Sequence, residues 1–370
     1  MENTQFDMNN KSRLRRDDFQ KTIGGKQTDL FILKNNKGME VAVTNYGCTL
    51  LSIMVPDKKG IFNNVILGHS SLDDILNCPE PFLNTVVGRY ANRIAKGKFT
   101  LKGNQHQLAI NNGPNALHGG PTGFHARVWD VKQTTENSIV FTYTSKDGEE
   151  GYPGNLQVEL TYSLDNDSNS LHINYQAITD QTTVVNLTSH GFFNLTGIDN
   201  PTSSIEDNIV SSIEDNIVTI NADFYAPIDE TSIPTGEIAK VHNTPMDFTT
   251  PHTVGDRIND DFIQLKHGAG YDHCYVLNKT EPKTLTLAAT CEDTKSGRSM
   301  EVYTTEIGVQ LYTGNWLGGF KGAHGATFPA RSAICFEAQC LPDTPNRPYF
   351  PSAKLEPGEI YKQHTVYKFK

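Results

Sequence analysis

Residues 156–177 read LQVELTYSLDNDSNSLHINYQA, and this stretch decides the fold class. Apolar side chains alternate with polar ones from Leu156 to Leu164 and again from Leu171 to Ala177. The run between them, at 165–170, contains only Asp, Asn and Ser, which favour turns. Two segments of period-two alternation around a polar turn predict an antiparallel β-hairpin in which each strand buries one face.

The same alternation recurs outside this hairpin. It is found at Val41 and Val43, at Ile139, Phe141 and Tyr143, and at Leu285 and Leu287. No stretch offers four helical turns with caps, so we expect helix only as short turns near Leu72–Leu76 and 253–258. The sequence therefore predicts an all-β protein, built as a large antiparallel β-sandwich.

The domain organisation is expected to be simple. A chain of 370 residues could hold two domains, but all-β sandwiches of this size also form single domains. Residues 1–22 are polar, and three arginines in this segment are followed directly by Asp17 and Asp18. This balance of charges predicts a solvated, poorly ordered N-terminal arm, not an anion-binding site. No Pro/Gly/Ser-rich linker divides the remainder, so we expect one β-sandwich domain over 23–370.

The overall composition argues against several classes of protein. Hydrophobic residues make up 37% and charged residues 20% of the chain, as in folded globular proteins and unlike disordered ones. The net charge of -10 argues against a nucleic-acid partner, because phosphate binding requires a basic surface. No run approaches the ~18 apolar residues of a membrane-spanning helix, so no membrane partner is expected.

The cysteines and the N-terminal residues bear on localisation. The chain has 6 cysteines but no CxxC pair of the kind that marks a zinc or redox site. Cys274 and Cys335 lie in apolar, strand-like runs, so we expect reduced and mostly buried thiols. The opening residues, MENTQ, lack the apolar core of a signal peptide. We therefore expect a cytoplasmic protein.

The chain also contains a perfect duplication. Residues 203–210, SSIEDNIV, are repeated without change at 211–218. An insert of even length keeps the same side chains facing inward when it lengthens a strand. Solenoids need three or more units that are longer than this, so the repeat does not indicate one. We interpret it as a local duplication that enlarges a surface loop or extends a strand.

Five short polar clusters interrupt the strand-like sequence. They are NR at 92–93, LHGG at 117–120, SHGFFNL at 189–195, GYDH at 270–273 and FEAQ at 336–339. Histidine, acidic, arginine and asparagine side chains among small residues and aromatics suit a pocket that binds a polyol and moves protons on it. There is no HExxH motif, paired Cys/His spacing or phosphate-binding glycine motif. We therefore expect neither a metal nor a cofactor.

Together the clusters resemble those of the aldose 1-epimerases, the galactose mutarotase family, from about Asn45 to Tyr361. The similarity is most specific at FEAQ and at LPDTPN, 341–346. It implies a β-sandwich of the galactose mutarotase type and an isomerase that interconverts the α and β anomers of free aldoses such as galactose and glucose. The expected partner is a small sugar substrate, and the expected assembly is a monomer or homodimer.

The resemblance also implies roles for individual residues. His190 matches the general acid and Glu337 the general base, and the imidazole pKa of about 6.5 suits proton exchange near neutrality. The expected sugar contacts are Asn92, Arg93, His118, Gly191, Phe192, Asp272 and Gln310. At Gly191 the chain departs from the family, which more often has a larger residue such as Ser. Arg89 is expected to have a structural role instead.

Three alternatives stay open at this point. A non-catalytic sugar-binding sandwich would need the hydroxyl contacts but not a facing acid and base. A hexose-6-phosphate 1-epimerase would need a cationic phosphate clamp. A glycoside hydrolase would need two carboxylates that flank the scissile bond, and only Glu337 and Asp272 are candidates.

Overall fold

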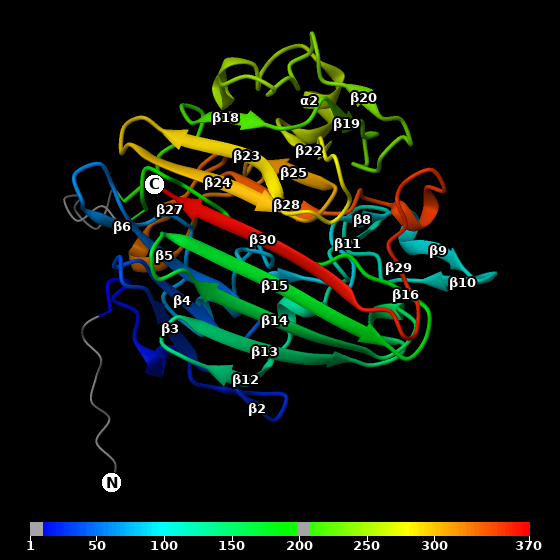
Figure 1. Ribbon diagram of the computed structural model, residues 1–370, viewed down its shortest axis with the longest axis horizontal. Coiled ribbons are helices and arrows are strands. Elements are labelled where there is room, and N and C mark those ends of the chain that lie inside the picture. Colours follow the sequence, from blue (N-terminus) through cyan, green and yellow to red (C-terminus); the bar gives the residue numbers. More distant parts are fainter. Residues whose placement is uncertain (1–9, 199–207) are drawn as a thin grey trace.

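Antiparallel strands form most of the regular structure in residues 10–198 and 208–370, the part of the chain that the computed structural model describes (Figure 1). The largest sheet has nine strands and includes the predicted hairpin near its middle. In spatial order these strands are β12 (Asp130–Thr134), β13 (Ser138–Ser145), β14 (Leu156–Leu164), β15 (Ser170–Thr179), β30 (Tyr361–Phe369), β24 (Arg298–Thr304), β23 (Thr286–Asp293), β18 (Ile217–Ile220) and β21 (His252–Thr253).

Two smaller sheets pack against this one. The five-stranded sheet runs in the order β20 (Ala239–Lys240), β19 (Phe224–Ala226), β22 (Asp272–Val276), β25 (Gly308–Tyr312) and β28 (Cys335–Gln339). The four-stranded sheet consists of β3 (Leu30–Lys34), β4 (Glu40–Thr44), β5 (Leu50–Pro56) and β6 (Phe62–Asn64). One continuous cluster of buried side chains joins all three sheets, including Leu160 of β14, Val41 of β4 and Leu311 of β25. This shared core makes the architecture a β-sandwich.

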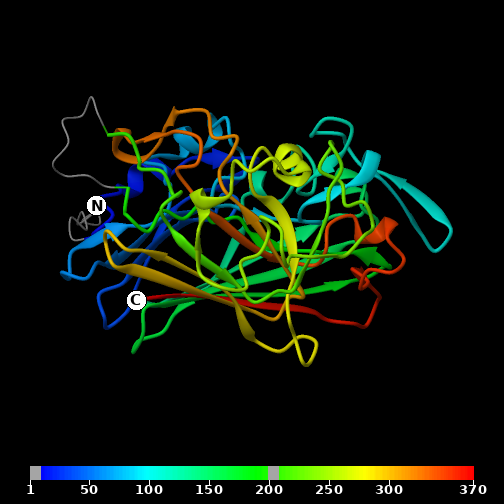
Figure 2. The ribbon, with the colours of Figure 1, turned by 90° about the horizontal axis from the view of Figure 1, so that it is seen from above.

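Short strand pairs and turns fill the space between the large sheets. The pairs are β1 (Thr22–Ile23) with β2 (Lys26–Gln27), β7 (Val86–Val87) with β17 (Thr188–Ser189), β8 (Arg93–Ile94) with β11 (Ala116–Leu117), β9 (Lys98–Leu101) with β10 (Asn104–Gln107), β16 (Thr183–Val184) with β29 (Lys354–Leu355), and β26 (Phe320–Lys321) with β27 (Thr327–Phe328). The α-helices are α1 (Leu72–Leu76) and α2 (Ile263–Gly268). The 3-10 turns are Arg16–Phe19, Ala95–Gly97, Phe124–Ala126, Glu149–Gly151, Val254–Asp256, Ala323–Gly325 and Thr344–Asn346. Seen from above, α2 and many of the connecting segments lie on the opposite side of the molecule from the long strands of the nine-stranded sheet (Figure 2).

The predicted all-β fold and its hairpin are confirmed. Strands β14 and β15 pair in antiparallel register, with Leu164 opposite Leu171. The expected short helix at Leu72–Leu76 is present, with Ser71 accepting a hydrogen bond from the Asp74 N–H as its N-cap. The turn expected over 253–258 is a 3-10 turn at Val254–Asp256. The alternation at Leu285 and Leu287 coincides with the start of β23, although both of these leucine side chains are exposed and a register shift follows Leu287.

The N-terminal segment packs more closely than its composition indicates. Residues 1–9 lie outside the described part of the chain, whereas Leu14 and Phe19 are buried in a cluster with Leu72 of α1. The expected poorly ordered arm over 1–22 therefore does not describe residues 10–22, because two apolar side chains among the charged ones anchor this segment. A single domain over 23–370 stays a prediction.

Most of the first copy of the duplicated octapeptide, 203–207, lies outside the described residues. The second copy is part of the core. Ile213 and Val218 are both fully buried, and β18 begins at Ile217.

All six cysteines are unpaired thiols, and four of them are buried. Among the described residues, none of the helices has the length and apolar character that crossing a membrane would require.

Candidate active site

The five-stranded sheet divides its side chains between the core and a cavity. In β28, Phe336 joins the central core, so the adjacent Glu337 faces the other side. Glu337 lies directly opposite Gln310 of β25. Asp272 of β22 lies opposite Tyr312, two residues further along β25. Period-two geometry therefore places an amide, a phenol and two carboxyl groups on the cavity face of this sheet.

His190 reaches the same cavity from a different sheet. It follows β17, which pairs with β7, and its backbone N–H donates to the Thr85 carbonyl at 3.0 Å. The ring stacks on Phe192, with ring centroids 4.7 Å apart and planes inclined by 11°. Its Nε2 lies 3.5 Å from Oε1 of Glu337. The stacking fixes the ring plane and directs Nε2 to the carboxyl group.

His118 is held by an unusual turn of the backbone. Its φ is +53°, and its Nδ1 accepts a hydrogen bond from the Asn92 N–H at 3.1 Å. We infer that the proton of the neutral ring lies on Nε2. Gly119 follows with φ +84°, and a Cβ there would lie 2.0 Å from the Gly88 carbonyl oxygen. Only glycine fits this approach, which places the imidazole of His118 5.2 Å from that of His190, centroid to centroid.

Arg93 and Asp272 form a polar pair on the cavity wall. Arg93 Nη2 lies 3.8 Å from Asp272 Oδ2, and Arg93 Nε donates to Asn112 Oδ1 at 3.0 Å. Asp272 Oδ1 accepts a hydrogen bond of 2.7 Å from the Gln310 amide. These contacts fix the carboxylate and leave room around it for hydroxyl groups, which carboxylates readily accept.

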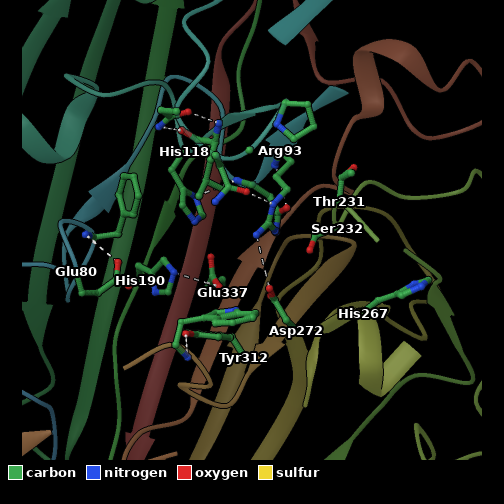
Figure 3. A pocket seen from close by; sticks show the side chains of 18 of the residues that line it. Glu80, Arg93, His118, His190, Thr231, Ser232, His267, Asp272, Tyr312 and Glu337 are labelled. Carbon is green, nitrogen blue, oxygen red and sulfur yellow. Dashed lines mark hydrogen bonds and ion pairs between the residues drawn. The ribbon is translucent and has the colours of Figure 1, made fainter. Parts of the chain in front are cut away.

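These side chains surround a cavity of about 730 Å³ (Figure 3). The lining contains Asn92, Arg93, His118, His190, Asp272 and Glu337. Sequence reasoning missed other lining residues, among them Glu80, Thr231, Ser232, His267, Tyr312 and Trp316. Thr231 and Ser232 lie on a loop with no motif. Glu80 lies between two prolines, shortly before the Asn92 cluster in the sequence. An acidic residue at that position is the signal that could have indicated it.

Three expected sugar contacts, Gly191, Phe192 and Gln310, are not among the residues that line the cavity. Phe192 is fully buried and supports the His190 ring, while Gln310 orients Asp272. Gly191 is also not among the lining residues, and a Cβ there would approach the Phe193 ring to 2.8 Å. Arg89 lies outside the cavity lining as expected and donates to the carbonyls of Pro153 and Gly154. The structure thus separates residues that face the cavity from residues that position them.

Burial sets the protonation states of the two central groups. It lowers the pKa of His190 to about 3. Burial and the nearby charge of Asp272 raise the pKa of Glu337 well above its usual value, and Arg93 opposes this shift. Both shifts favour the form in which the imidazole is neutral and the carboxyl group holds the proton. Oε2 of Glu337 and Nδ1 of His190 are buried without a hydrogen-bond partner, as expected where a ligand completes the network.

Comparison with known proteins agrees with this geometry. The family model described as aldose 1-epimerase matches residues 29–368. The chain belongs to the aldose 1-epimerase family. The members of this family are isomerases. The galactose mutarotase of Mus musculus is 44% identical to this chain over 347 residues, covering 94% of this chain and 95% of the relative. The aldose 1-epimerase of Haemophilus influenzae is 37% identical over 352 residues, covering 94% and 97%.

Solved structures of the family have the same fold. The galactose 1-epimerase of Lactobacillus acidophilus superposes with a TM-score of 0.79 at 31% identity, covering 95% of this chain and 96% of that one. An aldose epimerase homologue from C. elegans gives a TM-score of 0.82 at 27% identity, covering 93% and 99%. The predicted galactose mutarotase type of β-sandwich is therefore confirmed.

Proposed function

We propose that this protein is an aldose 1-epimerase that interconverts the α and β anomers of free aldoses such as galactose and glucose. The observation that carries the proposal is the 3.5 Å contact between His190 Nε2 and Glu337 Oε1 inside a cavity with hydroxyl-binding groups. Ring opening removes one proton from the C1 hydroxyl and delivers one to the ring oxygen. A buried pair that shares one proton suits this exchange. It takes up one proton and releases another, so the pair holds the same number of protons before and after the ring opens.

We assign Glu337 as the base and His190 as the acid. These roles require the ion-pair form, in which the shared proton has moved from the carboxyl group to the imidazole. Burial alone favours the neutral form, but sugar hydroxyls that donate to the carboxylate stabilise its charge, and so does Arg93. Once the ring is open, the aldehyde rotates about the C1–C2 bond. Closure then reverses both proton transfers and yields the other anomer.

The remaining lining residues would hold the sugar. Asp272 accepts hydroxyl hydrogen bonds, while Arg93, Asn92 and the His118 Nε2–H donate them. Gln310 would act by orienting Asp272, and Phe192 by supporting His190. No step in this scheme needs a cofactor.

The charges of the cavity favour an unphosphorylated substrate. Its lining contains four carboxyl side chains and two Lys or Arg side chains, namely Glu80, Glu230, Asp272 and Glu337 against Arg93 and Lys266. Both cations already have acidic partners, Arg93 in Asp272 and Lys266 in Asp261. A phosphate group normally requires several convergent donors. A hexose-6-phosphate substrate would bring further negative charge to these acids.

Polarimetry of freshly dissolved α-galactose and α-glucose tests the proposal. We expect the protein to accelerate the approach to the anomeric equilibrium and to turn over glucose-6-phosphate with lower kcat/KM than either free sugar. Binding of galactose without any acceleration would instead identify a sugar-binding protein. A preference for the phosphorylated sugar would assign the chain to the hexose-6-phosphate branch.

We also propose a cytoplasmic location and a monomeric or homodimeric state. The six unpaired thiols support a reducing compartment. Light scattering coupled to size-exclusion chromatography measures the assembly. Fractionation of the source cells measures the location.

A further inference from the structure

Asn84 contacts the backbone of both His190 and Phe192 without facing the cavity. It is fully buried and is not among the residues that line the cavity. Its backbone N–H donates to the His190 carbonyl at 3.1 Å, and its side-chain Oδ1 accepts the Phe192 N–H at 2.8 Å. We propose that Asn84 is a positioning residue, one that fixes the orientation of the His190 ring through Phe192. This inference rests on the proposed function, in which His190 is the acid.

The segment from His190 to Phe192 needs an external partner of this kind. Regular pairing of β17 with β7 ends at Ser189, which lies opposite Val86. Gly191 then follows His190, and glycine restricts the backbone less than any other residue. Asn84 makes one hydrogen bond to each of the two peptide groups that flank Gly191. It therefore constrains the chain where the chain constrains itself least.

Asparagine suits this position in two ways. Its φ is +59°, a left-handed conformation that asparagine adopts more readily than most residues. Its side chain has both an acceptor and a donor, and the Nδ2 group donates to the Leu67 carbonyl. The Leu67 N–H in turn donates to the Phe192 carbonyl at 2.9 Å. The amide thus closes a ring of hydrogen bonds that includes both backbone polar groups of Phe192.

The position of Phe192 matters because few other contacts orient the His190 ring. In the described part of the chain Nδ1 of His190 has no hydrogen-bond partner, and Nε2 lies 3.5 Å from Glu337 Oε1. The ring contacts are Phe192, His118 and Tyr312, with centroids 4.7, 5.2 and 6.2 Å away. The stack on Phe192 is the closest of the three. A misplacement of about 1 Å at a reacting group can cost about 100-fold in rate.

Asn84→Gly isolates the contribution of the side chain. Glycine adopts a positive φ and keeps the backbone N–H that donates to the His190 carbonyl. The variant removes both side-chain hydrogen bonds and leaves the Phe192 N–H without its acceptor. We expect kcat for galactose to fall by at least about 10-fold, with little change in KM. Asn84→Asp keeps the size of the side chain and its acceptor, so it should lose less of kcat.

Asn45→Ala is the matched control. Asn45 is also buried, its Oδ1 accepts the Asp29 N–H at 2.8 Å, and it does not line the cavity. Its loss removes a comparable set of side-chain hydrogen bonds, so the melting temperature should fall while kcat stays parental. A drop in kcat for Asn84→Gly and not for Asn45→Ala separates positioning from general destabilisation.

A double-mutant cycle with Phe192→Leu tests whether Asn84 acts through the ring. Phe192→Leu removes the ring but keeps the backbone N–H. If Asn84 acts through Phe192, the loss of kcat in the double variant should be smaller than the product of the two single losses. A loss equal to that product would overturn the proposal, and so would a folded Asn84→Gly protein with parental kcat. If Asn84→Gly does not fold, Asn84→Asp takes its place in the same cycle.

Nuclear magnetic resonance of protein with labelled histidine gives a readout that does not depend on activity. The ring current of Phe192 shifts the signals of the stacked His190 ring, which His190→Asn assigns. Asn84→Gly should move these signals and Asn45→Ala should not, and unchanged His190 signals in Asn84→Gly would contradict the inference. A parent protein that shows this shift but does not accelerate mutarotation would remove the proposed function and leave the positioning of His190 by Asn84 in place.

Discussion

At the scale of single residues, the chemistry depends on two buried groups in contact. His190 and Glu337 are 5% and 2% exposed. We expect Glu337→Gln and His190→Asn each to lower kcat by at least about 100-fold, because a general acid or base typically contributes 10²–10⁴-fold. KM should change far less. Asp272→Asn should raise KM as well, since its proposed role is to bind hydroxyls. Polarimetric kinetics measure both parameters.

A melting transition like that of the parent must accompany each of these variants. A folded Glu337→Gln protein that retains parental turnover would remove Glu337 from the mechanism. It would also favour the sugar-binding alternative.

The pH profile should reflect the reversed order of the two pKa values. From the residue types, the acid limb of kcat/KM would belong to Glu337 and the alkaline limb to His190. Burial lowers the pKa of His190 to about 3 and raises that of Glu337, so the acid limb reports a second proton on His190. The alkaline limb reports loss of the proton from Glu337. We expect a broad plateau through neutral pH, whose limits belong to the coupled pair.

Glu80→Gln is the control for this assignment. The charge of Glu80 contributes to raising the pKa of Glu337, and burial raises the pKa of Glu80 itself to about 7. Removing that charge should move the alkaline limb to lower pH and leave the acid limb in place. A narrow optimum near pH 6.5 in the parent would contradict the prediction.

At the scale of elements, one glycine determines where His118 lies. Gly119 and Gly103 both have positive φ, +84° and +81°, but a Cβ at Gly103 meets nothing within 4 Å. We expect Gly103→Ala to cost about 1–2 kcal/mol for its left-handed backbone. Gly119→Ala should cost more, because its Cβ collides with the Gly88 carbonyl, and it should also raise KM by displacing His118. Urea unfolding and kinetics test this, and equal costs for the two variants would contradict it.

The duplicated octapeptide permits a deletion that is specific to this chain. Deleting 203–210 or 211–218 gives the same sequence, so the surviving copy can occupy the buried positions of Ile213 and Val218. The Asn194 amide donates to the Ser211 carbonyl at 2.8 Å, so the ends of the connection are already close. Because loop length costs only about 0.6 kcal/mol per doubling, we expect the deletion to retain folding and activity.

Thermal melting and polarimetry of the deletion variant test this expectation. Ile213→Ala in the full chain is the control and should destabilise by about 2–5 kcal/mol. Insoluble deletion protein would show that both copies are required by the core.

At the scale of the whole molecule, the sheets share one core. Leu160 and Leu311 are fully buried in the same cluster but belong to different sheets. We expect Leu160→Ala and Leu311→Ala each to lower the stability of a single unfolding transition by about 2–5 kcal/mol. Ile178→Ala, at a side chain that is 46% exposed, should cost much less. Denaturation followed by circular dichroism and fluorescence tests this, and two separate transitions would contradict a single domain over 23–370.

The sequence by itself determined the local elements of this protein. The alternation from Leu156 to Leu164 predicted its strand because the period-two pattern is set by the backbone and needs no distant partner. The helix at Leu72–Leu76 followed from an equally local rule. The sequence did not indicate that Leu14 and Phe19 are buried or that Leu287 is exposed, because the burial of a side chain depends on what packs against it.

Only the tertiary structure decided how the candidate site is built. His118, His190 and Glu337 come from three separate segments of the chain, and no spacing along the chain records that their polar atoms meet. A side-chain hydrogen bond from Gln310 orients Asp272, and ring stacking on Phe192 orients His190, which residue type cannot reveal. The order of the two pKa values also depends on burial that the fold creates. Residue types indicated which groups could do the chemistry, whereas long-range packing decided their distances, their protonation states and which of them face the cavity.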